Sequence, residues 1–206
     1  MEKIGFIGLG IMGKWMALNM MKAGYELMVN DTDPQAVKFL ADQGAAVAIA
    51  PAEMAAKVDW IFLSVPDTDV VELVVLGERG ILDGAREGLV VVDLSTIDYL
   101  TTLKIEKKLA QRGVIFSDAP VSGMEKRAQD ATLTIMFGGR KDIFELVLPA
   151  LGAIGNEQIY MGEIGCGQLT KLINQLLFNI SAAGIAEVLP MAAKLGLDPE
   201  KVRNNK

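Results

Sequence analysis

Short, continuous apolar runs alternate with stretches of helical periodicity along most of the chain. The runs predict strands at residues 3–7, 26–30, 46–49, 59–65, 89–94, 114–117, 131–137 and 158–161. The stretches between them predict helices at residues 11–23, 33–43, 67–76, 97–111 and 141–151. Strands that are apolar throughout need cover on both faces. The alternation therefore predicts an α/β fold, a Rossmann-type doubly wound and mostly parallel sheet.

The pattern changes after residue 163. Residues 167–195 form one long helical pattern without a strand signal. Its apolar positions are Leu169, Leu172, Ile173, Leu176, Leu177 and Ile180. Polar residues interrupt this stretch, Asn179 and Glu187 among them, which argues against a membrane span and a membrane partner. We expect a nucleotide-binding domain at residues 1–163, and at 164–206 a long interdomain helix that begins an all-α domain.

A helix start signal follows at Asp198, Pro199 and Glu200, which combine a cap, a first-turn proline and an early acid. Only six residues come after it. We therefore expect a C-terminal truncation inside the all-α domain. The long helix would then expose apolar surface, so we expect a homodimer or a larger oligomer formed through that helix.

The first strand and the first helix are joined by three glycines with the spacing G-x-G-x-x-G, namely Gly8, Gly10 and Gly13. In a dinucleotide site the first glycine makes the tight turn, the second lets the backbone approach the pyrophosphate, and the third lets helix and strand pack closely. The pyrophosphate would sit on the helix N-terminus. The same loop includes Leu9, Ile11 and Met12.

An acid, Asp31, ends the second predicted strand, where dinucleotide sites bind the adenosine ribose hydroxyls. A carboxylate there repels a 2′-phosphate, and its neighbours Asn30 and Thr32 carry no compensating positive charge. The sequence therefore favours NAD over NADP as the cofactor.

Composition narrows the class of protein. The chain is 51% hydrophobic, with a formal charge of −6 and no basic run, so nucleic acid is not an expected partner. It has no histidine, which excludes a histidine-based triad and leaves no expected metal site. Its single cysteine, Cys166, fits a reducing compartment, and a strand begins at residue 3 without a signal peptide, so we expect a cytoplasmic protein.

Several candidate site residues lie at or just after the ends of predicted strands, at the sheet edge where open α/β sheets bind ligands. They are Val65 and Pro66, Ser95 and Thr96, and Ser122 and Gly123. The hydroxyl of Ser122 and nearby free backbone N–H groups would suit a carboxylate, although a plain N-cap serine explains the same residue. Simple strand-to-helix loop chemistry is an equal alternative for Pro66 and Thr96.

Four stretches in order resemble the β-hydroxyacid dehydrogenase family, which includes 3-hydroxyisobutyrate dehydrogenase and tartronate semialdehyde reductase. They are residues 5–20 (GFIGLGIMGKWMALNM), 92–96 (VDLST), 118–123 (DAPVSG) and 165–167 (GCG) followed by Lys171 and Asn174. The likeness covers essentially all 206 residues. It implies reversible, nicotinamide-dependent oxidation of a short 3-hydroxy acid to a semialdehyde.

The resemblance also assigns roles. Lys171 would handle the substrate proton, Asn174 would help hold the substrate, Ser122 and Gly123 would bind its acid group, and Thr96 would lie near the nicotinamide. In a chain without histidine a lysine is a natural base for a hydroxyl proton. The plain alternative is a solvated lysine on a helix face.

Two departures from the family pattern concern glycines, because Met124 and Ala131 stand where glycine is usual. A side chain at Met124 would narrow the substrate pocket or shift its loop, so the substrate stays open, with succinic or glyoxylic semialdehyde as alternatives. A second reading is an NAD-binding module without catalysis of its own. A third is an imine reductase, against which Lys171 counts.

Overall fold

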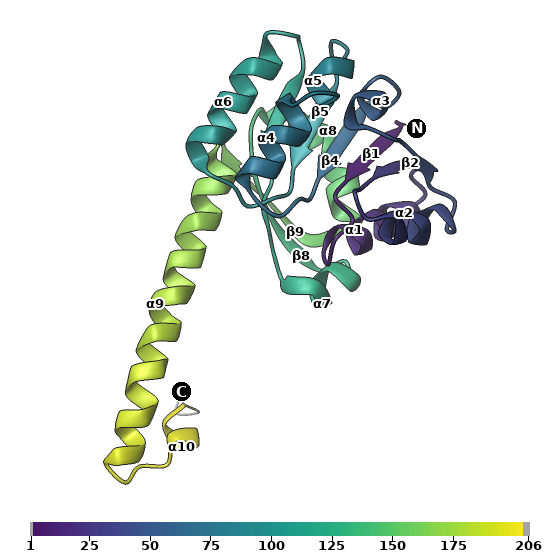
Figure 1. Cartoon of the computed structure of the whole chain (residues 1–206). Helices are drawn as coiled ribbons and strands as arrows, with labels where there is room; N and C mark the ends of the chain where they lie inside the picture. The colour runs from purple at the N-terminus through teal and green to yellow at the C-terminus, as the bar shows by residue number, and fades with distance from the viewer. Residues whose placement is uncertain (1, 204–206) are drawn as a thin grey trace. The chain divides into compact units, whose positions relative to one another are not determined.

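A computed structural model describes residues 2–203 of the chain. By compactness it divides into two units, the first ending at Lys171 and the second starting at Leu172. The first unit is a doubly wound α/β domain (Figure 1). The expected Rossmann-type fold class is confirmed.

Within the described residues, the strands form a nine-stranded sheet in the order β3-β2-β1-β4-β5-β6-β8-β7, with β9 paired to β8. The first six strands in this order, from β3 through β1 to β6, are all parallel. Strand β8 runs antiparallel to both β6 and β7. The chain reverses its direction of winding between β1 and β4, which places the ligand crevice of such folds at the carboxyl ends of these two strands. The strands are β1 (Ile4–Ile7), β2 (Leu27–Asn30), β3 (Ala46–Val47), β4 (Trp60–Leu63), β5 (Val90–Asp93), β6 (Ile115–Asp118), β7 (Val121–Ser122), β8 (Leu133–Gly138) and β9 (Gly155–Gly162).

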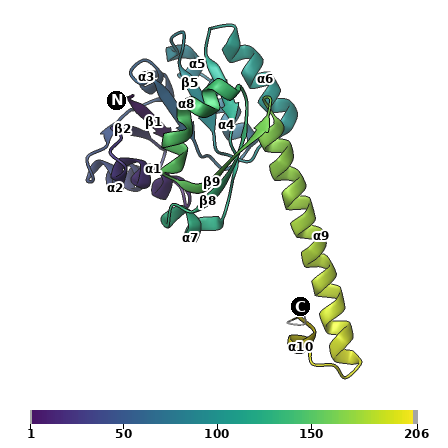
Figure 2. The same ribbon diagram turned by 180° about the vertical axis from the view of Figure 1, so that it is seen from behind.

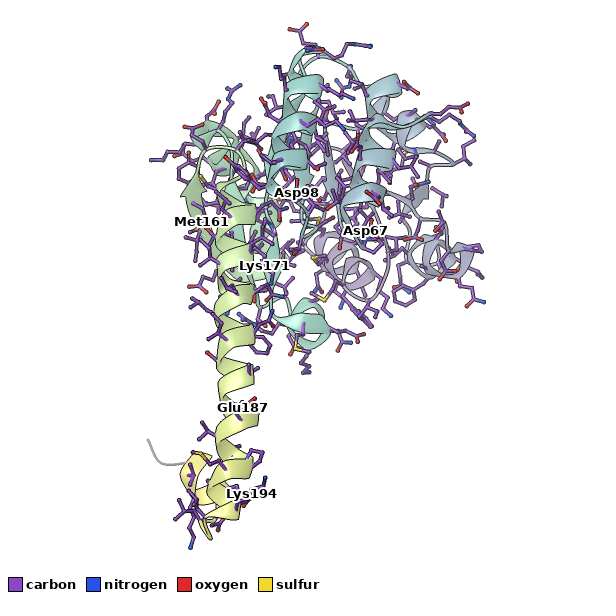
Figure 3. The ribbon with its side chains drawn as sticks, turned by 60° about the vertical axis from the view of Figure 1, so that its left-hand side comes forward. Asp67, Asp98, Met161, Lys171, Glu187 and Lys194 are labelled. Carbon is purple, nitrogen blue, oxygen red and sulfur yellow. The ribbon has the colours of Figure 1, made fainter. Side chains whose placement is uncertain are left out.

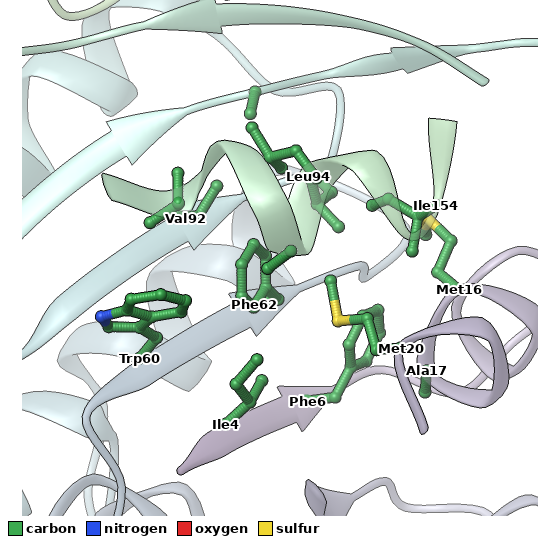
Figure 4. Packing of buried hydrophobic residues seen from close by; sticks show 14 of the residues in the cluster. Ile4, Phe6, Met16, Ala17, Met20, Trp60, Phe62, Val92, Leu94 and Ile154 are labelled. Atoms are coloured by element: carbon green, nitrogen blue, oxygen red, sulfur yellow. The ribbon is translucent and has the colours of Figure 1, made fainter. Parts of the chain in front are cut away.

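Alternate strand residues supply two separate cores. Ile4, Phe6 and Phe62 point to one face, and Ile61 and Leu63 point to the other. The first face is covered by α1 (Gly13–Lys22), α2 (Pro34–Ala41), α7 (Met124–Gln129) and α8 (Lys141–Gly152), and part of its core is drawn in Figure 4. The second face is covered by α3 (Pro51–Ala55), α4 (Thr68–Leu76), α5 (Ile81–Gly84) and α6 (Tyr99–Ala110). Helix α8 comes forward when the molecule is seen from behind (Figure 2).

Aspartates begin three of the helices of the first unit. Asp33, Asp67 and Asp98 accept hydrogen bonds from the backbone N–H groups of Gln35, Val70 and Thr101. Each satisfies a donor that the helix cannot pair internally, which is why α2, α4 and α6 start where they do. Sequence patterns did not predict α3, α5 or β7, because these elements have too few residues to establish a period.

The last helices are α9 (Cys166–Lys194), which continues from the first unit into the second, and α10 (Pro199–Arg203). Beyond Leu172 most apolar side chains of α9 are exposed, including Leu176, Leu177, Phe178 and Ile180. By length and composition alone α9 would qualify as a membrane span. That is weak support, because helices of soluble proteins pass the same test.

Candidate active site

The glycine loop between β1 and α1 has the geometry of a pyrophosphate cradle. Gly8 adopts φ of 92°, and a Cβ there would collide with the backbone oxygen of Ser64. A Cβ at Gly13 would collide with the backbone oxygen of Gly8. A Cβ at Gly10 would meet nothing within 4 Å. Gly8 and Gly13 therefore allow the tight turn and close packing, while Gly10 leaves the space that a pyrophosphate needs.

The other predicted residues of the glycine loop, Leu9, Ile11 and Met12, differ in exposure and position. Leu9 is buried, Ile11 is 67% exposed, and Met12 is the N-cap residue of α1 without a side-chain cap of its own. An uncapped helix N-terminus keeps backbone N–H groups available for an anion. The structure thus fits a bound dinucleotide at this loop.

Asp31 lies at the carboxyl end of β2 and faces the glycine loop. Its carboxylate accepts hydrogen bonds from the backbone N–H of Leu9 and, at 2.8 Å, from that of Asp33. Oδ1 also accepts from the hydroxyl of Thr32 at 3.5 Å. These contacts hold the carboxylate beside the cradle, while Oδ2, which accepts only from Leu9, keeps a further acceptor position. The amide of Asn30 instead donates to the carbonyl of Ala48 at 2.8 Å, which ties β2 to the residue after β3.

A second group of predicted residues meets at the carboxyl ends of β4 and β5. Ser95 is buried, and its Oγ accepts a hydrogen bond of 3.0 Å from the backbone N–H of Val65. The backbone N–H of Ser95 donates to Oδ1 of Asp93 at 2.9 Å. Pro66 and Thr96 are exposed beside these anchored positions. The two loops that the sequence placed at this edge are therefore joined through Ser95.

Two buried carboxylates underlie this edge, at the paired positions Asp93 on β5 and Asp118 on β6. Burial raises the pKa of Asp93 to about 7, and the nearby charge of Asp118 acts in the same direction. Burial also raises the pKa of Asp118 to about 6, although hydrogen bonds from Gly165 and Gln168 oppose the shift. Among residues 2–203, Oδ2 of Asp93 and Oγ of Ser117 are buried without a hydrogen-bond partner.

Asp118 anchors the start of α9. Its Oδ1 accepts from the backbone N–H of Gly165 at 2.6 Å, and its Oδ2 accepts from that of Gln168 at 2.7 Å. A Cβ on Gly167 or on Gly138 would press on the Asp118 carboxylate. The glycines around this carboxylate therefore let it reach the unpaired donors of the helix.

Lys171 lies on α9, and Figure 3 labels it together with Asp67 and Asp98, the N-cap residues of α4 and α6. It is only 8% exposed and has no salt bridge within residues 2–203. Burial alone lowers its pKa below the ordinary lysine value. Asn174 follows on the same helix but belongs to the second unit, where it is exposed.

Ser122 and Gly123 form the turn between β7 and α7. Ser122 is half-buried, and Gly123 adopts φ of 143°. Met124 follows with φ of 59° and is 83% exposed, and Ala131, just after α7, has φ of 55°. Both positions have the left-handed backbone that glycine adopts most easily, so the structure explains why glycine is the usual residue there.

Helix α7 packs on α1, next to the glycine loop. Trp15 Nε1 donates to Glu125 at 3.1 Å, and the amide of Asn19 donates to the carbonyl of Ala128 at 2.8 Å. These two bonds fix the turn at Ser122 and Gly123, before α7, relative to the glycine loop before α1.

The sequence patterns missed the roles of Asp93, Asp118 and Gln168. The first two lie inside stretches that carry the family resemblance, and each ends an apolar strand. A charged residue buried at a strand end needs partners, which was the available signal. No pattern marked Gln168.

Two surface cavities of the described residues lie away from this site. One, of about 450 Å³, is lined by Glu87, Glu106 and Arg140 among others, and the other, of about 470 Å³, by residues such as Lys3 and Lys57. No predicted site residue lines either one. Residues 2–203 also contain no group of His, Cys, Asp or Glu arranged to hold a metal.

Comparison with protein families gives two matches that cover nearly the whole chain. Residues 3–162 match the family described as the NAD binding domain of 6-phosphogluconate dehydrogenase. Residues 165–205 match the family described as NAD-binding of NADP-dependent 3-hydroxyisobutyrate dehydrogenase.

Curated relatives and solved structures agree with these matches. The chain is 40% identical over 201 residues to 2-(hydroxymethyl)glutarate dehydrogenase of Eubacterium barkeri, covering 98% of this chain and 67% of that protein. It is 40% identical over 197 residues to human mitochondrial 3-hydroxyisobutyrate dehydrogenase, covering 96% of this chain and 59% of that protein. The structure of 3-hydroxyisobutyrate dehydrogenase from Mycobacterium tuberculosis with L-serine superposes with a TM-score of 0.91 at 32% identity, covering 96% of this chain and 67% of that one. The chain thus spans about three fifths to two thirds of the length of these relatives.

Proposed function

This chain belongs to the β-hydroxyacid dehydrogenase family, and we propose on that premise that it transfers hydride between NAD(H) and a short 3-hydroxy acid or its semialdehyde. The proposed substrates are of the 3-hydroxyisobutyrate or tartronate semialdehyde class. The names of the relatives support the class of reaction. They do not select one acid, because the side chain of Met124 stands where the family usually has glycine, next to the turn assigned to the substrate.

The observation that carries the proposal is the state of Lys171. A lysine that is nearly buried, lacks a salt bridge among the described residues and has a pKa lowered by burial gives up its proton more readily than an ordinary lysine. A solvated lysine on a helix face would be neither buried nor lowered in pKa.

We assign the steps as follows. A bound NAD⁺ would supply the acceptor for the hydride that leaves the carbon carrying the hydroxyl group. Neutral Lys171 takes the hydroxyl proton on Nζ as the carbonyl forms, and returns it in the reverse direction. The hydroxyl of Ser122 and the backbone at Gly123 hold the acid group of the substrate. Asn174 is assigned a substrate-holding role from the family resemblance alone.

The cofactor is assigned to the glycine loop, with Gly8, Gly10 and Gly13 as the cradle and Asp31 at the adenosine ribose. The open space at Gly10 and the held carboxylate of Asp31 support this placement. Because Asp31 would repel a 2′-phosphate, we propose NAD as the preferred form. Val65, Pro66 and Thr96 would border the nicotinamide end of the crevice.

Turnover with a panel of acids tests the proposal. The chain would be incubated with NADH and either methylmalonate semialdehyde, tartronate semialdehyde or succinic semialdehyde, with NADPH in parallel. We expect NADH oxidation with at least one of the first two and a weaker response to NADPH. NADH binding without NADH oxidation in the presence of any of these semialdehydes would favour the alternative, a cofactor-binding module whose chemistry needs residues outside this sequence.

We also propose a cytoplasmic protein that associates as a homodimer or larger oligomer through α9. Exposed leucine, isoleucine and phenylalanine side chains along residues 172–180 support the association. Sedimentation at micromolar concentration tests it, and a monomer would contradict it.

A further inference from the structure

Gln168 is a fully buried polar residue near the start of α9, and the proposed chemistry gives it no role. Both ends of its side-chain amide are used. Oε1 accepts a hydrogen bond of 3.1 Å from the backbone N–H of Ile97, and Nε2 donates one of 2.8 Å to the carbonyl of Ser95. Only one orientation of the amide satisfies both partners, so Gln168 binds the loop between β5 and α6 in a single geometry.

The backbone of the same residue is held from another strand. The N–H of Gln168 donates to Oδ2 of Asp118 on β6 at 2.7 Å. Gln168 is therefore fixed from two directions, its main chain by β6 and its side chain by the loop that follows β5. The start of α9 has little freedom to slide or turn relative to these two strands.

The loop that Gln168 binds, residues 95–97, contains Thr96, which is assigned to the nicotinamide. Thr96 lies between the two gripped residues and is exposed, and Ser95 also binds the backbone of Val65 across the crevice edge. Lys171 is three residues beyond Gln168, about one helical turn along α9. The side chain of Gln168 therefore provides a hydrogen-bonded link between the helix that carries Lys171 and the loop at residues 95–97.

We propose that Gln168 is a positioning residue, which locks the first turn of α9 to residues 95–97 and so fixes Lys171 relative to the nicotinamide loop. The inference rests on the proposed function, since it matters for catalysis only if Lys171 exchanges the proton. Hydride and proton leave neighbouring atoms of one substrate, so the groups that receive them must keep fixed positions relative to each other. A misplacement of about 1 Å is enough to reduce turnover strongly.

The test follows Lys171 directly, by NMR titration of a chain labelled with ¹³Cε-lysine, with the signal assigned through Lys171→Arg. In the wild type we expect a midpoint below the ordinary lysine value, because the side chain is buried. Gln168→Met keeps the side-chain length and removes both hydrogen bonds. We expect it to move the midpoint toward the ordinary value by about half a pH unit or more. It should also lower kcat about tenfold while the KM for NADH is retained.

Two controls separate positioning from stability. Gln111→Met makes the same chemical change at an exposed site, and Val147→Ala weakens the core of the other sheet face. Neither should move the Lys171 midpoint. If Gln168→Met does not fold, Gln168→Asn replaces it, because the shorter amide cannot reach both partners.

The outcomes are distinct. A Lys171 midpoint that is the same in wild type and in the folded Gln168 variant overturns the positioning role, as does an ordinary midpoint in the wild type. A shift confined to the Gln168 variant supports it. Absence of turnover in the wild type would contradict the proposed function instead, and the titration would still decide the role of Gln168.

Discussion

The two halves of the proposed site are built in different ways. The cofactor half, residues 5–31, is one contiguous segment, and the hydrogen bond that joins its glycine loop to its acid links Leu9 and Asp31, 22 residues apart. The acid–base half brings together residues 93–97, 118–123 and 165–171. Its hydrogen bonds join residues 50 apart between Asp118 and Gln168, and 73 apart between Ser95 and Gln168. A local motif is visible in the sequence, whereas an assembled one needs the fold.

The halves also differ in what holds them. In the cofactor half the main constraint is steric, since Gly8 and Gly13 have no room for a Cβ. In the acid–base half the constraint is polar, with Asp93, Asp118 and Gln168 all buried. Buried polar groups are stable only while their partners stay in place, so the second half should respond more to pH.

The largest expected effect would break the cofactor half alone. Gly13→Ala places a Cβ against the backbone oxygen of Gly8, and backbone cannot move aside cheaply. We expect NADH affinity to fall about 100-fold, equivalent to about 2.7 kcal/mol, with the titration of Lys171 unchanged. Fluorescence titration with NADH measures the affinity. Gly152→Ala is the matched control, because a Cβ there meets nothing within 4 Å. Equal losses in both variants would contradict the steric account.

The next effect concerns pH and the acid–base half. A carboxyl whose pKa is higher in the folded than in the unfolded chain binds its proton more tightly when folded. The stabilisation that this carboxyl gives the folded chain is therefore complete below its unfolded pKa, which is near 4. It is lost as the pH rises through its folded pKa. For Asp93 the folded value is about 7, so the contribution of Asp93 to wild-type stability should fall between about pH 4 and pH 7.

Asp93→Asn removes this titration while keeping an oxygen for the N–H of Ser95. We expect the variant to be more stable than the wild type at pH 8, by about 2 kcal/mol, and to lose that advantage at pH 4. Urea unfolding at the two pH values measures the difference. The same pH slope in both chains would show that Asp93 does not titrate as described.

These contrasts explain what the sequence could and could not predict. Apolar runs predicted the parallel sheet because β1, β4 and β5 are buried on both faces. The glycine spacing and the acid at Asp31 could be recognised because they lie close together in the sequence, and Gly13 is crowded by Gly8 of the same loop. The crowding of Gly8 by Ser64, which follows β4, needed the fold. The partners of Asp118 could not be predicted, since a strand end does not reveal which distant helix start it will meet. Gln168 carries no local signal at all.

The smallest expected effect sharpens the assignment of the substrate turn. Met124→Gly and Ala131→Gly each place glycine at a left-handed position, and we expect each to raise stability by up to about 1 kcal/mol. Only Met124→Gly should also change the KM for the acid substrate, because only Met124 is next to the Ser122–Gly123 turn. Thermal unfolding and steady-state kinetics on both variants check this. Equal effects of the two variants on the KM for the acid substrate would contradict the placement of Met124 at the substrate pocket.

The most direct measurement of the central claim compares NADH affinity and NADH oxidation in the wild type and in Lys171→Ala. If the halves are separate and Lys171 exchanges the substrate proton, oxidation should fall about 100-fold or more. The dissociation constant for NADH should then stay within about twofold of the wild-type value. Retained oxidation in Lys171→Ala would contradict the assignment of Lys171, and a lost NADH affinity would contradict the separation of the two halves.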